Sequence, residues 1–174
     1  MSAKRDFSRD RTFLIDLTRC TGCRACQVAC KQWNQLKAEK TTFFSGEGYQ
    51  NPHAPSERTL TTIRFRDYPR HGENEFAFYK EMCMHCNEPA CASVCPVSAF
   101  TKTPEGMVVY NADRCIGCRF CMLACPFGIP KYEWSRVLPL VVKCSGCYSR
   151  VKEGLIPACA KTCPAAITYG SRAD

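Results

Sequence analysis

The 174-residue sequence has no long apolar run. Its longest strongly apolar stretch, VLPLVV at residues 137–142, is far shorter than the roughly 20 residues that a membrane-spanning helix needs. The residues before the first cysteine also lack an apolar stretch of signal-peptide length. These absences predict a chain that does not insert into a membrane, and they favour a cytoplasmic location.

The sequence also lacks the motifs that mark bond-making catalysis. It has no signature of a nucleophile with its base, no phosphate-binding loop and no Rossmann glycine pattern. Lys and Arg number 24 against 16 Asp and Glu, a formal net charge of +8, but the basic residues are scattered and form no sustained run. Nucleic-acid binding is therefore not expected, and neither is an enzyme active site.

What the sequence has in excess is cysteine, with sixteen residues in four groups and none left over. Each group opens with CxxC and closes with CxxxC. The first and third groups lie in an internal repeat, FLIDLTRCTGCRACQVAC at 13–30 and VVYNADRCIGCRFCMLAC at 108–125, which indicates duplication of a unit. The groups are Cys20, Cys23, Cys26 and Cys30; Cys83, Cys86, Cys91 and Cys95; Cys115, Cys118, Cys121 and Cys125; and Cys144, Cys147, Cys159 and Cys163.

The spacing CxxCxxCxxxC is typical of ligands to a cubane iron–sulfur cluster. Three sulfurs from one tight loop converge on a small inorganic core, and the fourth, one helical turn on, points away toward a neighbouring cluster, as in bacterial two-cluster ferredoxins. Proline, whose fixed φ redirects the chain, follows Cys95, Cys125 and Cys163, whereas Lys31 follows Cys30. The spacing therefore predicts [4Fe-4S] clusters held by exchanged ligands.

Two other uses of cysteine are disfavoured by the same spacing. Structural zinc pairs one CxxC with a distant CxxC and has no use for a third thiolate at the next step. Disulfides between such close neighbours would need short, strained loops. The alternative to an iron–sulfur protein is a scaffold held together by zinc or a nucleic-acid-binding module.

The cluster count also accounts for the charge. Sixteen cysteines suffice for four [4Fe-4S] clusters. If every thiol is a thiolate and every oxidised core carries a charge of +2, the clusters and their ligands contribute −8 and offset the formal +8 of the chain. The basic residues would then balance the clusters.

Chain length indicates which groups exchange ligands. The connection from Cys95 to Cys115 is just long enough to cross a two-cluster ferredoxin, so the second and third groups form an inner unit at 81–140. The first and fourth groups form an outer unit from 1–40 and 141–174, and residues 41–80 are an insertion of loop and hairpin. The expected ligand sets are Cys20, Cys23, Cys26 and Cys163; Cys30, Cys144, Cys147 and Cys159; Cys83, Cys86, Cys91 and Cys125; and Cys95, Cys115, Cys118 and Cys121.

The predicted fold class is α+β, a duplicated two-cluster ferredoxin with a strand-and-loop insertion. The turn at residues 104–106 predicts a hairpin, and alternating apolar residues predict a second one in the insertion. A loop at 43–57 is expected to cover a surface. Expected strands are 98–103, 107–110, 58–67 and 75–81, and expected helical turns are 26–37, 88–95, 118–125 and 157–163.

The segments CRACQVACKQWN, CMHCNEPAC, CRFCMLACPFGIPKY and PACAKTCP, with the order of the cysteines, resemble a known family. This family comprises the four-cluster electron-transfer subunits of molybdenum and tungsten oxidoreductases of the DMSO reductase type, and the nearest likeness is to the formate dehydrogenase beta subunit. The resemblance runs from Thr12 to Tyr169 and implies a nested double ferredoxin.

The resemblance also implies partners. A molybdenum or tungsten pterin subunit would catalyse formate or aldehyde oxidation, or alternatively polysulfide, thiosulfate or DMSO reduction. An electron-accepting subunit such as a flavoprotein, or a second copy of this chain, would meet the other end. The chain itself is expected to be non-catalytic.

The resemblance bears on location as well. Membrane-bound formate dehydrogenase beta subunits continue into a C-terminal transmembrane helix, whereas this sequence stops at Asp174, so a soluble complex is expected. In exported relatives the targeting signal is on the catalytic subunit. A periplasmic location by co-export is therefore the alternative to the cytoplasm.

Five further residues are candidates for supporting roles. Trp33 is expected to pack in the core and shield a cluster. His85 could donate a hydrogen bond to cluster sulfur but is not expected to be a fifth ligand. Arg19, Arg114 and Lys143 each precede a cluster cysteine; solvated positions are the ordinary outcome, and a nearby cation would raise a cluster potential.

Overall fold

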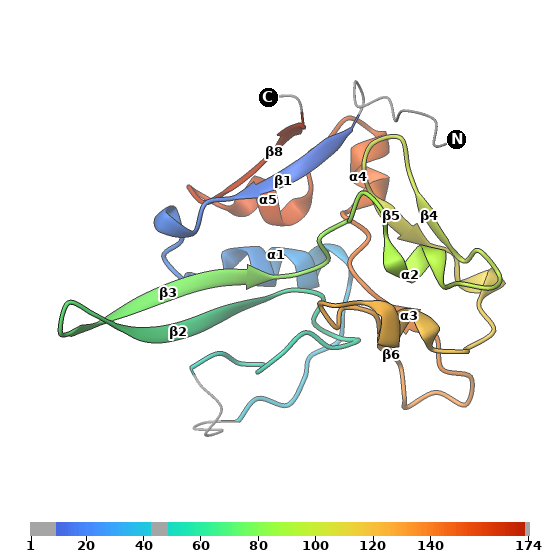
Figure 1. The fold of residues 1–174 in the computed structure, drawn as a ribbon, viewed down its shortest axis with the longest axis horizontal. Coiled ribbons are helices and arrows are strands. Elements are labelled where there is room, and N and C mark those ends of the chain that lie inside the picture. The colour runs from blue at the N-terminus through green and yellow to red at the C-terminus, as the bar shows by residue number, and fades with distance from the viewer. Residues whose placement is uncertain (1–9, 43–48, 173–174) are drawn as a thin grey trace.

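The chain folds into short helices and two-stranded antiparallel sheets, as seen for residues 10–42 and 49–172 of a computed structural model (Figure 1). The strands are β1 (Arg11–Ile15), β2 (Thr62–Arg70), β3 (Glu73–Glu81), β4 (Phe100–Lys102), β5 (Val108–Tyr110), β6 (Lys131–Tyr132), β7 (Val141–Val142) and β8 (Ile167–Ser171). The α-helices are α1 (Ala25–Trp33), α2 (Ala90–Ser93), α3 (Phe120–Ala124), α4 (Tyr148–Lys152) and α5 (Ala158–Thr162). Two 3₁₀ turns, η1 (Leu17–Arg19) and η2 (Ala112–Arg114), complete the α+β fold.

The two ends of the described chain meet in one sheet. Strand β1 pairs antiparallel with β8, and Phe13 faces Tyr169 across the ladder with ring centroids 5.1 Å apart. Helix α1 packs against α5 beneath this sheet (Figure 1). The first and fourth cysteine groups, which are far apart in sequence, therefore lie in the same region.

The second and third cysteine groups are joined by the predicted hairpin. Strand β4 pairs with β5, and helix α2 packs against α3. Both strands are shorter than predicted but lie within the expected ranges. The two helices also begin late, because Pro89 is the N-cap of α2 and Arg119, before α3, has a left-handed φ of 67°.

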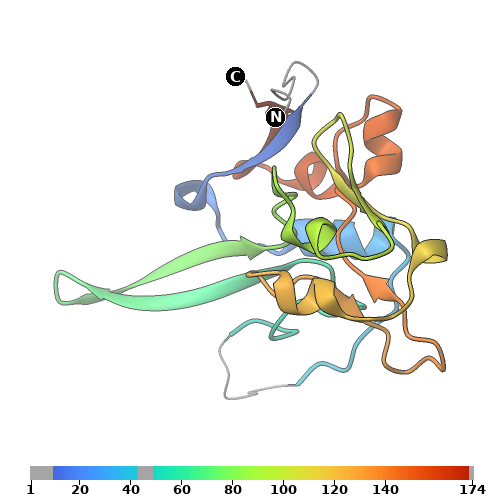
Figure 2. The same ribbon diagram turned by 45° about the vertical axis from the view of Figure 1, so that its right-hand side comes forward.

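The hairpin of the insertion projects from the body of the molecule (Figures 1 and 2). Its strands extend further than predicted toward the tip, because the connection is only His71 and Gly72, which have φ of 51° and 83°. Two residues with positive φ form the tight turn that matches the twist of paired strands. Most of the predicted connection YPRHGEN is therefore strand, and Pro69 is tolerated because both strands of a two-stranded sheet are edges.

The internal repeat is visible in the backbone. Before the first cysteine of each copy, a short polar residue caps a 3₁₀ turn: Thr18 N–H donates to Asp16 at 2.9 Å and Asp113 N–H donates to Asn111 at 2.9 Å. Such caps satisfy donors that a short turn would otherwise leave unpaired. The repeated sequence therefore gives two similar approaches to a cysteine loop.

Some predicted boundaries were wrong and some elements were missed. Helix α1 ends at Trp33 rather than at residue 37, because Gln35 has a φ of 51° and the Asn34 side chain donates to the Cys30 carbonyl at 2.8 Å. Strands β1, β6, β7 and β8 and helix α4 were not predicted. Of the predicted surface loop 43–57, residues 43–48 lie outside the described residues.

The core is divided into small clusters built around cysteines. One contains Cys26 and Cys159, a second contains Cys121, and a third contains Cys30 and Cys144, each with a few aliphatic or aromatic neighbours. Across residues 10–42 and 49–172, no helix is both long enough and apolar enough to cross a membrane.

Candidate metal centres

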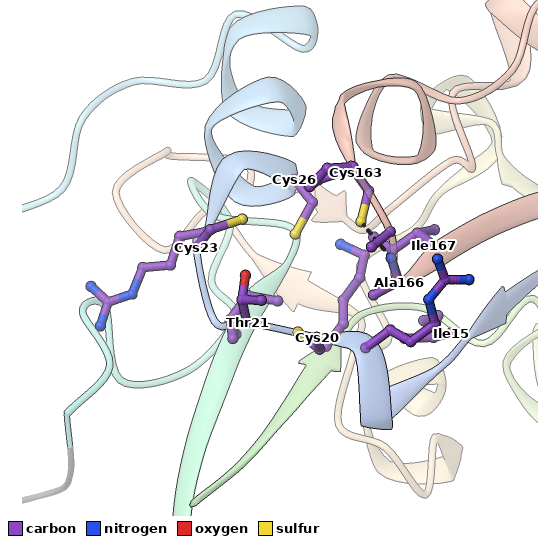
Figure 3. A pocket seen from close by; sticks show the side chains of 14 residues that line it. Ile15, Cys20, Thr21, Cys23, Cys26, Cys163, Ala166 and Ile167 are labelled. Atoms are coloured by element: carbon purple, nitrogen blue, oxygen red, sulfur yellow. Dashed lines mark hydrogen bonds between the residues drawn. The ribbon is translucent and has the colours of Figure 1, made fainter.

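All sixteen cysteines are free thiols, and four of them line one pocket. These are Cys20, Cys23, Cys26 and Cys163, whose sulfurs face a common space in Figure 3. Cys20 follows η1, Cys26 lies in the first turns of α1, and Cys163 directly follows α5. The packing of α1 on α5 thus adds a thiol from the fourth group to three from the first.

A second pocket is lined by Cys30, Cys144, Cys147 and Cys159. Cys30 lies one helical turn after Cys26 in α1, farther along the same helix, and the two thiols line different pockets. Cys159 and Cys163 divide in the same way across α5. The segment of α1 and the segment of α5 therefore each supply one or more thiols to both pockets.

The third set is recognised from the surroundings of Cys91. Burial raises the pKa of the Cys91 thiol, and the neighbouring thiols of Cys83, Cys125 and Cys86 raise it further. These are the four residues expected together.

The fourth set surrounds Cys121. Burial raises the pKa of Cys121 to about 11, and Cys115 and Cys118 are the next causes. Cys95 belongs to the same apolar cluster as Cys115 and Cys121. Three of the four expected residues, Cys95, Cys115 and Cys121, thus lie in one cluster, which also includes Cys91 of the third set.

Cysteines of different sets also pack against one another. Cys26 of the first set packs in one apolar cluster with Cys159 of the second. Cys83 of the third set packs against Cys30 and Cys144 of the second, and Cys91 of the third set packs in the cluster of Cys121 of the fourth. These contacts join the first set to the second, the second to the third, and the third to the fourth.

Backbone N–H groups point at several of the sulfurs. Gly117 N–H lies 3.4 Å from Cys115 Sγ and Gly146 N–H lies 3.3 Å from Cys144 Sγ. Both glycines have left-handed φ, 73° and 68°, so the turn itself favours glycine and also aims the N–H at sulfur. In the second group His85 takes the same position with φ of 46°.

Gly146→Ala is expected to destabilise the loaded protein. A Cβ at Gly146 would lie 2.1 Å from Sδ of the fully buried Met107. Backbone strain and overpacking together should lower the free energy of unfolding by about 2–4 kcal/mol. The matched control is Gly117→Ala, where φ is also positive but nothing lies within 4 Å of the added Cβ. Thermal unfolding of this variant should show only the smaller loss of stability that comes from backbone strain. Equal losses in the two variants would contradict the packing argument.

The donor set fits iron–sulfur clusters. Burial is the main cause that raises the pKa of Cys30 to about 12, so the bare thiol is protonated at neutral pH, and binding to a metal replaces this proton. Soft thiolates in groups of four suit such clusters. Among the described residues, no three or more His, Cys, Asp or Glu side chains lie close enough together to hold a single metal ion; the thiols of the first two sets instead surround pockets.

His85 joins the second and third groups. Its buried ring accepts the Val108 N–H at Nδ1, 3.0 Å away, which leaves the proton on Nε2 to point at Cys144 Sγ at 3.7 Å. Burial, followed by Lys143 and Lys102, holds the pKa of His85 well below its usual value, so the ring is neutral. The predicted role as a donor to sulfur is supported, although the sulfur belongs to another cysteine group.

The other supporting residues divide into two classes. Lys143 is buried, donates to the Cys144 carbonyl at 2.8 Å and lies 3.8 Å from Cys83 Sγ, whereas Arg19 and Arg114 are exposed. The expectation that Trp33 is core packing was wrong. Its side chain is 44% exposed and stacks under the Arg150 guanidinium at 4.5 Å.

Lys80 was missed by the sequence analysis. It lies in β3 and looks like an ordinary polar residue of a half-exposed strand, yet only 4% of it is exposed. It lines both the first and the second pocket. Burial raises the pKa of Cys26 and Cys30, and Lys80 is the strongest opposing influence on both.

Comparison with known proteins identifies the family of these cysteine sets. Residues 74–172 match the model of the 4Fe-4S dicluster domain, and residues 11–32 match that of the 4Fe-4S binding domain. The chain belongs to the 4Fe-4S dicluster family. Its domains and sixteen cysteines fit four [4Fe-4S] clusters.

Two related chains are iron–sulfur subunits of formate dehydrogenases. The formate dehydrogenase-O iron-sulfur subunit of Escherichia coli is 40% identical over 173 residues, which cover 97% of this chain and 55% of the relative. The nitrate-inducible formate dehydrogenase iron-sulfur subunit of the same organism is 38% identical, covering 99% and 58%. A probable anaerobic dimethyl sulfoxide reductase chain, YnfG, is 39% identical, covering 87% and 68%. The chain thus spans less than two thirds of the length of both formate dehydrogenase subunits.

Proposed function

We propose that this chain is a non-catalytic electron-transfer subunit that relays electrons through four [4Fe-4S] clusters between a catalytic subunit and an acceptor subunit. The observation that carries the proposal is the packing of the thiol sets against one another, the first with the second, the second with the third, and the third with the fourth. A line of redox centres has two ends, and it can carry electrons between two partners.

The proposed cluster ligands are the four sets of cysteines expected from the sequence. Cys26 and Cys30 of α1 serve different clusters, and so do Cys159 of α5 and Cys163, which follows this helix; this gives the nested exchange of an outer ferredoxin unit around an inner one. The outer unit is formed by residues 1–40 and 141–174, the inner unit by 81–140, and 41–80 is the insertion. Backbone N–H groups and buried lysines stabilise the thiolate charge.

The proposed catalytic partner is a molybdenum or tungsten pterin subunit that oxidises formate or an aldehyde. The names of the relatives as formate dehydrogenase subunits support this partner. A polysulfide, thiosulfate or DMSO reductase is the second candidate, favoured by the similarity to a dimethyl sulfoxide reductase chain. The proposed acceptor is a flavoprotein or a second copy of the chain, in the cytoplasm.

Apolar side chains are exposed near both ends of the line. Leu123, 86% exposed, lies in α3 with Cys121 of the fourth set, and the exposed Leu17 lies in η1, which leads into Cys20 of the first set. Exposed apolar residues grouped near a functional site are typical of subunit contacts. They support docking at the two ends, next to the outermost clusters.

Cys147→Ala is expected to interrupt the relay, because Cys147 belongs to the interior second set. In the purified complex, oxidation of substrate with an artificial dye should stay near the wild-type rate when the dye takes electrons upstream of the break. Transfer to the physiological acceptor should fall at least a hundredfold. Unchanged transfer to the acceptor, with the second cluster demonstrably absent, would show that the clusters are not in series.

Metal analysis of the same complex distinguishes the other candidates. Molybdenum or tungsten in the copurifying subunit is expected with about sixteen irons per copy of this chain. Several zinc ions per chain with little iron would support the zinc-stapled scaffold instead.

A further inference from the structure

One buried cation stands between the first two thiol sets. Lys80 is 4% exposed and lines the pocket of Cys26 as well as that of Cys30. It arrives from outside the ferredoxin units, on β3 of the inserted hairpin, where it pairs in register with Ile63. The insertion therefore contributes a charge to the space between two cluster sites.

The surroundings of Lys80 do not neutralise this charge. Its ammonium donates to the Thr61 hydroxyl, and within residues 10–42 and 49–172 no carboxylate forms an ion pair with it. Burying an ammonium is costly unless an opposite charge compensates it. The thiolates that line the two pockets can supply the opposite charge.

We propose that Lys80 is a shared counter-ion of the first and second clusters and raises the reduction potentials of both. The proposal rests on the ligand sets of the proposed function. Uptake of one electron takes a core from charge +2 to +1, with no bond formed and no proton moved, so the cluster with its four thiolates becomes more negative. A fixed cation nearby favours that reduced state.

The position of Lys80 determines which reduction potentials it affects. Because one side chain faces both pockets, both potentials rise together. The difference between the two clusters then changes little, and an electron is not trapped on either. Lys143, which lies between Cys83 and Cys144, cannot replace Lys80 because it faces the next junction.

The test is a redox titration of the full chain, loaded with iron and sulfide anaerobically and followed by electron paramagnetic resonance. In Lys80→Met, two of the four clusters should show a tenfold or greater change in the ratio of oxidised to reduced form at a fixed potential, which is about 59 mV or more downward for a one-electron couple. Lys80→Arg, which keeps the charge, should stay near wild type. Lys37→Met removes an exposed lysine and should shift none.

The possible results distinguish failure of the counter-ion proposal from failure of the proposed function. Wild-type protein with fewer than four clusters would refute the proposed function before Lys80 is changed. Full iron in Lys80→Met with four unchanged potentials would overturn the counter-ion alone. If Lys80→Met does not take up iron and sulfide, Lys80→Gln is titrated instead. Loss of iron in Lys80→Met and Lys80→Gln but not in Lys80→Arg would support a need for the positive charge. Loss of iron in all three variants would overturn the proposal.

Discussion

Anaerobic removal of iron and sulfide is expected to unfold most of this chain. The three apolar clusters of the core each contain cysteines, and only a few aliphatic and aromatic residues surround them. The helices are nine residues or shorter, too short to be stable alone. Metal binding must therefore supply much of the folding free energy, as in other small metal domains.

Circular dichroism and thermal unfolding before and after chelation measure this dependence. The loaded protein should unfold cooperatively, and the metal-free protein should lose its cooperative transition and most of its helical signal. Reloading with iron and sulfide should restore both, which controls for irreversible damage. A metal-free chain that kept an unchanged spectrum and a cooperative transition would show that the protein part folds by itself.

Cys163→Ala is expected to remove the cluster of the first set, although Cys163 lies far along the sequence from Cys20, Cys23 and Cys26. All four thiols line one pocket, because α5 packs on α1. Iron should fall from about sixteen to about twelve per chain when one cluster is lost, and the other three should stay. Quantification of iron with resonance spectra of the reduced protein provides the measurement.

Two matched variants locate the lost cluster. Cys23→Ala removes another thiol of the same pocket and should abolish the same resonance. Cys147→Ala removes a thiol of the second pocket and should abolish a different one. If Cys163→Ala matched Cys147→Ala instead, the nested exchange of ligands would be refuted.

Local features of this fold were predictable because residues close in sequence decide them. The CxxC steps fix tight turns, and Gly117 and Gly146 adopt the positive φ that those turns require. The hairpin after Cys95 follows from its turn and alternating residues, and the structure has it as β4 and β5. Trp33 shows the limit, because its large apolar ring suggested burial and burial depends on what packs against it.

The sequence by itself determined the cofactor chemistry, since sixteen thiols at these spacings suit iron–sulfur clusters and the family match agrees. Only the tertiary structure decided how the parts meet. The pairing of β1 with β8 and the approach of Lys80 to two pockets join segments separated by many residues. No local pattern encodes them, because the energy of such contacts comes from burial and charge compensation that exist only once the chain has folded.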